Sequence, residues 1–304
     1  MQMATEDIGY DRLEKLKQKC NAVILAHNYQ PAGIQDIADY VGDSLGLAIK
    51  ASETDADTIV FCGVDFMAET AKVISPDRMV LIPEPESRCP LASMVTAEKL
   101  VELRKQHPGV PVVSYVNTPA SVKAESDICC TSSNMMEVIG SLDSDEIIFT
   151  PDKHMAAYIQ SKTPKKIIPW KGFCPTHVRI LPEHVIKQKK MHPHAEVLVH
   201  PECRLDVAQL GDTVTSTGGM ITHAKSSAAD EFIIATEIGL IHRLSREIPG
   251  KRFYPASENA VCPNMKKNSI AKVILALEKT QHEVKVPPKV MDGAKKAIER
   301  MLSL

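Results

Sequence analysis

Three cysteines that each precede a proline have the residue types and the spacing to do chemistry in this sequence. Cys89, Cys174 and Cys262 are separated by 85 and 88 residues, so the two intervals are nearly equal. Each cysteine ends a stretch that runs from an apolar strand through a proline and a short polar loop, in MVLIPEPESRCP (79–90), KKIIPWKGFCP (165–175) and KRFYPASENAVCP (251–263). We interpret the three cysteines as equivalent positions in three copies of one unit. If the copies surround a pseudo-threefold axis, the three thiolates can meet at one point.

Three thiolates with no fourth cysteine in the pattern favour an iron–sulfur cluster over a closed metal site. A [4Fe–4S] cluster can be held by three cysteines, and its fourth iron is then open to act as a Lewis acid. A structural zinc ion needs four ligands, and His177 in CPTH is the candidate for the fourth. The alternative without a metal is that all three are buried thiols in repeated loops. We expect the remaining cysteines to pack as small hydrophobic residues: Cys20, Cys62, Cys129, Cys130 and Cys203.

Self-similarity along the chain supplies the elements that must position these loops. The charged end of a helix, a turn and an apolar strand recur in EKLKQKCNAVILAH (14–27), ELRKQHPGVPVVSY (102–115) and KQKKMHPHAEVLVH (187–200). An Asp, a short apolar run and a hydroxyl recur in ADYVGDSLG (38–46), SDICCTSSN (126–134) and GDTVTSTGG (211–219). An acidic start and a strand recur in DTIVFCGVD (57–65), DEIIFTPDK (145–153) and DEFIIATEI (230–238). The matches keep nearly constant offsets, which indicates a triplication.

The expected fold follows from the pattern within each copy. The strands are continuous apolar runs, which is typical of parallel strands buried on both faces, and Thr96 and Pro182 are start signals for helices between them. We therefore predict an α/β fold: a pseudo-threefold triplication of three-layer αβα sandwich units with parallel sheets and the active site at the central junction. The predicted units are residues 1–87, 88–172 and 173–268. We expect the helices within 269–304 to pack back on the first unit.

The same offsets align three polar residues in each copy at the carboxyl ends of strands, where parallel sheets bind ligands. The aligned sets are His27, Tyr115 and His200, then Tyr29, Asn117 and Glu202, then Ser44, Ser132 and Thr217. The hydroxyls of the last set stand near helix starts, where free N–H groups favour a carboxylate or a phosphate. Capping of the helices is the alternative reason for a Ser or Thr there. His27, His177 and His200 can move protons near neutral pH, with Glu202 or Tyr29 as the partner acid or base.

Composition argues against several classes of function. The chain has 304 residues and a net charge of −2 without a basic block, so we expect neither nucleic acid nor a membrane surface as a partner. It shows no apolar run of membrane-spanning length and no export signal. Eight cysteines in such a chain indicate a reducing compartment. We therefore expect a cytoplasmic protein.

Over nearly its whole length the chain resembles the quinolinate synthases, iron–sulfur enzymes of NAD (pyridine nucleotide) biosynthesis. The stretches that carry the resemblance are ILAHNYQ (24–30), DIADYVGDSLGLA (36–48), CGVDFMAET (62–70), SYVNT (114–118), CTSSN (130–134), VHPEC (199–203), TSTGGM (215–220), ATEIGLIHRL (235–244) and NMKKN (264–268). One small departure is Thr176, where a hydrophobic residue is common before the histidine. The resemblance implies condensation of iminoaspartate (iminosuccinate) with dihydroxyacetone phosphate to give quinolinate, phosphate and water. It also implies a functional link to an aspartate oxidase or dehydrogenase.

The resemblance assigns roles residue by residue. It implies one [4Fe–4S] cluster per chain, held by Cys89, Cys174 and Cys262 with one iron open. It implies proton-handling or positioning roles for Tyr29 and His177, and we add Glu202 and His27 as candidate catalytic residues. The residues implied to contact the substrate acid are His27, Ser44, Tyr115, Asn117, Ser132, His200, Glu202 and Thr217.

Two other enzyme classes use three cysteines from three αβα units around an open cluster. The diphosphate reductase of isoprenoid synthesis would need diphosphate contacts, and the diphthamide synthase would need a broad face for docking a protein. A non-enzymatic iron or redox sensor would need an exposed cluster. This sequence instead places polar residues at the repeat-equivalent strand ends, which favours a small-molecule condensing enzyme.

Overall fold

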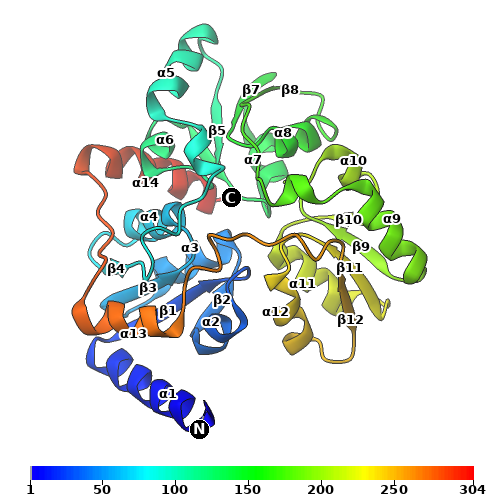
Figure 1. The fold of residues 1–304 in the computed structure, drawn as a ribbon. Helices are drawn as coiled ribbons and strands as arrows, with labels where there is room; N and C mark the ends of the chain where they lie inside the picture. Colours follow the sequence, from blue (N-terminus) through cyan, green and yellow to red (C-terminus); the bar gives the residue numbers. More distant parts are fainter. Residues whose placement is uncertain (1) are drawn as a thin grey trace. The chain divides into compact units, whose positions relative to one another are not determined.

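The fold consists of three parallel sheets of four strands with helices between them, and the three sheets share one strand order (Figure 1). A computed structural model describes residues 2–304. In each sheet the second strand in the sequence lies at one edge, followed by the first, the third and the fourth. The orders are β2-β1-β3-β4, β6-β5-β7-β8 and β10-β9-β11-β12. The predicted α/β triplication is confirmed at this level.

The chain forms two compact units, of which the first contains one sheet. This unit comprises the chain up to Cys89 together with Pro263–Pro288. Its strands are β1 (Ala22–His27), β2 (Tyr40–Gly42), β3 (Thr58–Cys62) and β4 (Met79–Leu81). Its helices are α1 (Gln2–Lys19), α2 (Ala32–Ile37), α3 (Ser44–Glu53), α4 (Asp65–Ile74) and α13 (Ile270–Lys279).

The second unit, Pro90–Cys262 with Lys289–Leu304, contains the other two sheets. The strands of the second repeat are β5 (Val112–Tyr115), β6 (Ile128–Cys130), β7 (Glu146–Thr150) and β8 (Lys166–Pro169), and those of the third are β9 (Glu196–Val199), β10 (Thr213–Val214), β11 (Glu231–Ala235) and β12 (Arg252–Pro255). The helices of the second repeat are α5 (Ala97–Gln106), α6 (Ala120–Ala124), α7 (Met135–Ser141) and α8 (Lys153–Gln160). Those of the third are α9 (Pro182–Met191), α10 (Leu205–Ala208), α11 (Thr217–Ser226) and α12 (Gly239–Glu247), and α14 (Pro288–Leu302) ends the chain. Two short 3₁₀ helices, η1 (Ala92–Met94) and η2 (His177–Arg179), follow the first two Cys-Pro pairs.

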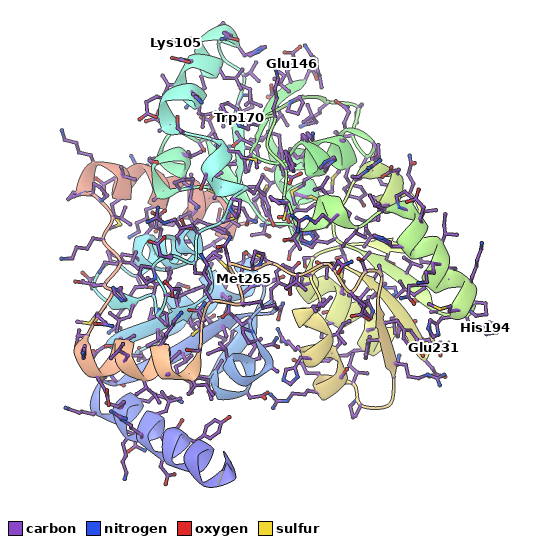
Figure 2. The ribbon with its side chains drawn as sticks, viewed as in Figure 1. Lys105, Glu146, Trp170, His194, Glu231 and Met265 are labelled. Atoms are coloured by element: carbon purple, nitrogen blue, oxygen red, sulfur yellow. The ribbon has the colours of Figure 1, made fainter. Side chains whose placement is uncertain are left out.

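Each sheet is covered by helices on both faces, which explains its apolar strands. On the first sheet, Ile24 and Val60 pack with residues of α1, α2 and α13 in one cluster. The equivalent clusters join α5 and α6 to the second sheet, and α9 and α10 to the third. Trp170, labelled in Figure 2, follows β8 in the second cluster and donates from its indole nitrogen to the Met94 carbonyl at 2.9 Å.

The aspartate that recurs in the second set of sequence matches has a structural role. In each copy its side chain accepts a hydrogen bond from the backbone of the first strand. The donors are Ile24 to Asp39 at 2.8 Å, Val112 to Asp127 at 2.7 Å and Val197 to Asp212 at 2.7 Å. Each aspartate therefore joins the start of an edge strand to the central strand beside it, which is why an acidic residue recurs at this position.

The two C-terminal helices belong to different units. Helix α13 places Val273 and Leu277 in the cluster of the first sheet. Helix α14 packs in the second unit, where Gly293 lies against Ala124 and Arg300 donates to the Asp127 carbonyl at 3.3 Å. The repeat boundaries 1–87, 88–172 and 173–268 stay a prediction.

Helix starts follow the expected signals at two sites. Thr96 caps α5 by accepting from the Lys99 N–H, and Pro182 is the first residue of α9. Among residues 2–304, no helix has both the length and the apolar character needed to cross a bilayer.

Candidate functional site

In the first unit, the predicted residues gather where β1 ends. The Tyr29 N–H donates to Nδ1 of His27 at 3.1 Å, and the two rings meet edge to face with centroids 4.6 Å apart. Because Nδ1 accepts this bond, neutral His27 carries its proton on Nε2. Both side chains are buried, and Ser44 begins α3. His27 and Tyr29 thus form one pre-arranged pair.

The ends of β5 and β9 in the second unit bring together most of the other predicted residues. The centre is an ion pair between His177 Nδ1 and Glu202 Oε2 at 2.7 Å, whose side chains are only 2% and 4% exposed. His177 lies in η2, directly after the second Cys-Pro loop, and Glu202 follows β9. The sequence predicted each residue separately, but the structure places them in contact.

Both ring nitrogens of His177 have partners. Nδ1 lies 3.2 Å from Sγ of Cys174 as well as 2.7 Å from Glu202. Nε2 lies 2.8 Å from the hydroxyl of Thr236. With a carboxylate at Nδ1 and a hydroxyl at Nε2, the ring is held in place.

His200 repeats the arrangement of His27. Its Nδ1 accepts from the Glu202 N–H at 3.4 Å, so Nε2–H of the neutral ring points toward Oγ of Ser132, 3.3 Å away. The His200 ring stacks on His177 with centroids 4.7 Å apart. The predicted residues His177, His200, Glu202 and Ser132 therefore form one continuous polar group.

Glu202 has two further donors. Asn117 donates from Nδ2 to Oε1 of Glu202 at 3.1 Å, and the side chain of Tyr115 also hydrogen-bonds to the carboxylate. Oδ1 of Asn117 is buried and has no partner among the described residues. A buried acceptor without a donor costs free energy, so this atom is available to a donor group on a ligand.

The electrostatics of this group separate its two carboxyls. Burial favours the neutral acid at Glu202, but the charge of His177 and the hydrogen bond from its ring outweigh burial and lower the pKa of Glu202 to about 2. Burial, with the nearby charge of Glu202, raises the pKa of Asp152 to about 7. Near neutral pH the group therefore contains one carboxylate that stays ionised and one carboxyl that can hold a proton.

The hydroxyls predicted at helix starts are not the caps of those helices. Asp43 caps α3 by accepting from the Gly46 N–H, and Ser216 caps α11 by accepting from the Gly219 N–H. Ser44 and Thr217 are the next residues, each the first in its helix. Capping therefore does not account for these two hydroxyls, which weakens the structural alternative for them.

The eight cysteines fall into two groups by environment. Cys89, Cys174 and Cys262 are partly exposed in their loops. Four of the others are buried, and burial raises the thiol pKa to about 12 at Cys62 and at Cys129 and well above its usual value at Cys130 and Cys203. Cys20 is partly exposed and lies 3.9 Å from the Leu277 carbonyl. The Cys-Pro cysteines are thus more accessible than the four buried thiols.

Among the described residues, one group of side chains brings together atoms that could bind a metal ion. Ligand atoms of Cys174, His177 and Glu202 lie within 4.8 Å of one another. The sequence raised His177 as an added ligand beside Cys174, and the structure adds Glu202 to the same point. The donor set combines one thiolate, one imidazole and one carboxylate.

Sequence reasoning missed two residues of this group. Thr236 contacts His177, and Asp152, at the end of the third strand of its copy, carries the raised pKa. Both stand in the repeated segments that end the third strand. The sequence feature that could have identified them is the acidic residue that recurs just after the third strand. In the third copy a threonine, Thr236, directly precedes this acidic residue.

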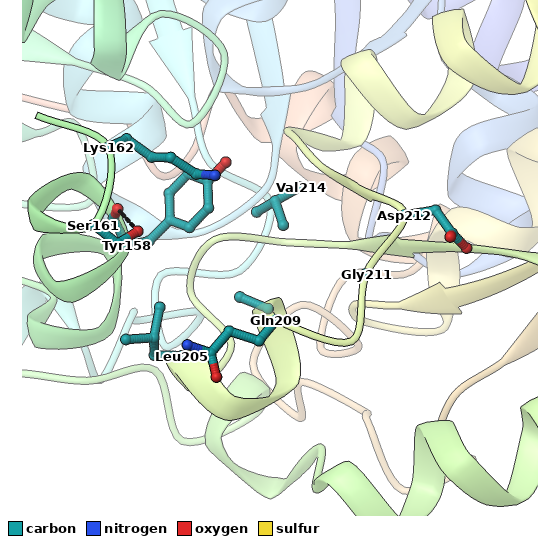
Figure 3. Close-up of a pocket in the computed structure, with 9 residues that line it drawn as sticks. Tyr158, Ser161, Lys162, Leu205, Gln209, Gly211, Asp212 and Val214 are labelled. Atoms are coloured by element: carbon teal, nitrogen blue, oxygen red, sulfur yellow. Dashed lines mark hydrogen bonds between the residues drawn. The ribbon is translucent and has the colours of Figure 1, made fainter.

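A separate hollow of about 440 Å³ lies between α8 and the α10–β10 segment (Figure 3). Tyr158 and Lys162 face Leu205 and Gln209 across it. Its lining contains none of the predicted site residues.

The chain is similar to one group of known proteins over nearly its whole length. Residues 11–303 match the family model described as quinolinate synthetase A protein. The chain is 56% identical over 293 residues to quinolinate synthase 1 of Methanosarcina acetivorans, covering 96% of both chains. It is 52% identical to the quinolinate synthase of Dehalococcoides mccartyi, again over 96% of both chains, and 50% identical to that of Alkaliphilus metalliredigens over 97% of both.

Proposed function

Because this chain belongs to the quinolinate synthase family, we propose that it condenses iminoaspartate with dihydroxyacetone phosphate to form quinolinate, phosphate and water. The observation that carries the proposal is the buried His177–Glu202 pair beside Cys174, with His200 stacked on it. Imine chemistry with loss of water needs groups that can give and take protons near neutral pH. This pair supplies them at a metal-ligand cysteine.

The cysteines fit a [4Fe–4S] cluster by their chemistry. Cys89, Cys174 and Cys262 are the partly exposed thiols that recur once per repeat, and they would hold the cluster. When bound, such a cluster supplies one iron with an open position, a Lewis acid that needs no redox change. We therefore propose a non-redox transferase reaction in which this chain's residues handle the protons.

The roles of the chain's residues follow from their contacts. Glu202 stays ionised and is paired with His177, whose imidazole is the proposed proton carrier, and Thr236 keeps the ring oriented. His200 presents Nε2–H toward Ser132, where it can donate to a substrate carboxylate. His27 and Tyr29 form the equivalent donor pair in the first repeat. The hydroxyls of Ser44 and Thr217 complete the proposed substrate contacts with Tyr115 and Asn117.

Iminoaspartate is unstable in water, so the proposal includes a source for it. We propose a functional link to an aspartate oxidase or dehydrogenase in the cytoplasm, which would form the imine from aspartate. The test mixes anaerobically purified protein, freshly generated imine and dihydroxyacetone phosphate, and follows quinolinate by absorbance and chromatography. Formation of quinolinate supports the proposal. Turnover of an isoprenoid diphosphate, or cleavage of S-adenosylmethionine, by the same protein would overturn it.

The cluster proposal has its own test in the cysteines. We expect Cys89→Ser, Cys174→Ser and Cys262→Ser each to lose bound iron and sulfide after anaerobic reconstitution. Cys20→Ser is the matched control because Cys20 is also partly exposed but lies outside the loops. Equal iron content in all four variants would contradict the assignment.

A second candidate for the metal is zinc, which the mixed donor set Cys174, His177 and Glu202 favours. Metal analysis separates the two proposals. Four iron and four sulfide per chain indicate the cluster, whereas one zinc without sulfide indicates the site of Cys174, His177 and Glu202. The threefold recurrence of the cysteine is the reason that we prefer the cluster.

A further inference from the structure

We infer that Asp65, Asp152 and Glu237 are positioning residues that hold the three Cys-Pro loops in the conformation that binds the cluster. The inference rests on the proposed function, because it takes Cys89, Cys174 and Cys262 as cluster ligands. Each carboxylate accepts a hydrogen bond from the backbone N–H of one of these cysteines. The distances are 3.0 Å for Cys89 to Asp65, 3.2 Å for Cys174 to Asp152 and 3.0 Å for Cys262 to Glu237.

A second hydrogen bond returns from the same turn to the same loop. In each copy it ends on the carbonyl oxygen two residues before the cysteine. The bonds are Asp65 N–H to Ser87 at 2.9 Å, Lys153 N–H to Gly172 at 2.8 Å and Ile238 N–H to Ala260 at 3.0 Å. We call each reciprocal pair of bonds a clasp: Asp65 with Cys89, Asp152 with Cys174 and Glu237 with Cys262.

The sheet order explains why the clasp forms three times. The carboxylate follows the third strand of its copy, and the cysteine follows the fourth strand, which is paired with the third in parallel. The carboxyl ends of neighbouring parallel strands lie at the same edge of a sheet. The two loops therefore meet. A helix begins after the third strand, and its first backbone N–H groups need a hydrogen-bond acceptor, which the carboxylate provides.

Each carboxylate also accepts from the start of the helix that follows it. Asp152 does so through Oδ1, from the His154 and Met155 N–H groups, while Oδ2 accepts from Cys174. Glu237 accepts from Gly239 on Oε2 at 2.7 Å and from Cys262 on Oε1. A rigid helix end is thus joined through one side chain to a cluster ligand.

The clasp fixes the cysteine from its amino side, and the proline that follows restricts it from its carboxyl side. Fixing both sides sets the direction in which Sγ leaves the backbone. An N–H donated to a carboxylate is also not donated to a cluster sulfur, and the carboxylate adds negative charge. Both effects lower the reduction potential of an iron–sulfur cluster, which suits a cluster that acts without redox change.

The decisive variant is Glu237→Gln. The two donors reach different oxygens of Glu237, and a glutamine has an NH₂ group in place of one of them, so it can keep the bond from Gly239 or the bond from Cys262 but not both. We expect the cluster of this variant to be removed by a chelator about tenfold faster, as for other residues that orient metal ligands. We also expect its reduction potential, measured by redox titration of the visible or EPR signal, to move to more positive values.

The matched control is Thr96→Ala, which removes the cap of α5, a hydroxyl that accepts from the Lys99 N–H and not from a cysteine. Both variants weaken a helix start, so both should lower the unfolding temperature. Only Glu237→Gln should change the chelation rate and the potential. If both quantities equal those of the unaltered protein, the carboxylate serves only as a helix cap and the inference is overturned. Neither measurement uses substrate, so failure of quinolinate synthesis is a separate result.

The chain without any substitution provides a further test. In cluster-free protein, we expect the amides of Cys89, Cys174 and Cys262 to exchange with deuterium at least about tenfold more slowly than in an unstructured peptide, because hydrogen bonds to charged groups contribute roughly 1.5–3 kcal/mol. Exchange at the peptide rate would show that the clasps do not persist in solution.

Discussion

Replacement of Glu202 by glutamine is the sharpest test of the buried pair. The fall of the Glu202 pKa from 4.5 to about 2 corresponds to about 3 kcal/mol, at about 1.4 kcal/mol for each tenfold change in acidity. Glu202→Gln keeps the shape of the side chain but removes the charge. We therefore expect the free energy of unfolding near pH 7 to fall by up to about 3 kcal/mol. Relief of the raised pKa of Asp152 offsets part of this loss.

The sign of the pH dependence follows from the direction of the shift. A carboxyl whose pKa is lower in the folded protein contributes its full stability above the unfolded value of 4.5. That contribution declines as the pH falls from 4.5 toward 2. The difference between the two proteins should therefore be largest near neutral pH and shrink in acid. Urea unfolding of cluster-free protein at a series of pH values measures it.

The chain contains a matched control for this prediction. Glu196 and His223 form the same kind of pair, with Oε2 and Nε2 2.6 Å apart, but both side chains are 32% exposed. Glu196→Gln should therefore cost less than about 1 kcal/mol. Equal losses for Glu196→Gln and Glu202→Gln, or a loss at Glu202 that does not change with pH, would refute the reasoning from burial. Quinolinate synthesis should fall only for Glu202→Gln.

Three further predictions concern single contacts. Thr236→Val should lower the free energy of unfolding by about 1 kcal/mol and alter the pH profile of quinolinate synthesis, because Nε2 of His177 loses its partner. Thr236→Ser should restore both the stability and the profile. An unchanged profile in Thr236→Val would contradict the positioning role. Gly172→Ala should lower both the unfolding temperature and the iron content, because a Cβ there would overlap the Pro151 carbonyl oxygen. The control is Gly140→Ala, where the space around the added Cβ is open. Equal iron content in the two variants would contradict the prediction. Ser269→Ala should cost about 1 kcal/mol by thermal unfolding, because Ser269 caps α13; no loss would mean that the cap is replaced by solvent.

Much of the fold could be predicted because the repeats constrain it. Continuous apolar runs such as AVILAH and EFIIA are typical of parallel strands buried on both faces, and they form β1 and β11. Because the offsets between copies are constant, a strand that is clear in one copy predicts the equivalent strand in a copy where the apolar run is weaker. The assignment of α14 could not be read in this way, because its apolar stripe fits any sheet and only tertiary contacts select the second unit.

The site was predictable in residue type but not in pairing. The offsets aligned His200 with His27, and both accept from the backbone two residues on. The contact of His177 with Glu202 joins a 3₁₀ helix after a Cys-Pro loop to the end of a neighbouring strand, and no spacing in the sequence encodes that distance. The roles of Asp65 and Glu237 could not be predicted either, because an acidic residue after a strand is also common at the start of a helix.

The first unit is built from two segments that lie far apart in the sequence, and this separation affects how the unit folds during synthesis. Residues Ile24 and Val60 of its sheet are covered in part by Val273 and Leu277 of α13, which leave the ribosome only after the strands of the other two sheets. Until then an apolar face of the earliest sheet lacks its cover, a situation in which nascent chains associate with chaperones or with one another. A chain that stops before Ser269 should therefore accumulate as insoluble protein, even though it retains every strand of all three sheets.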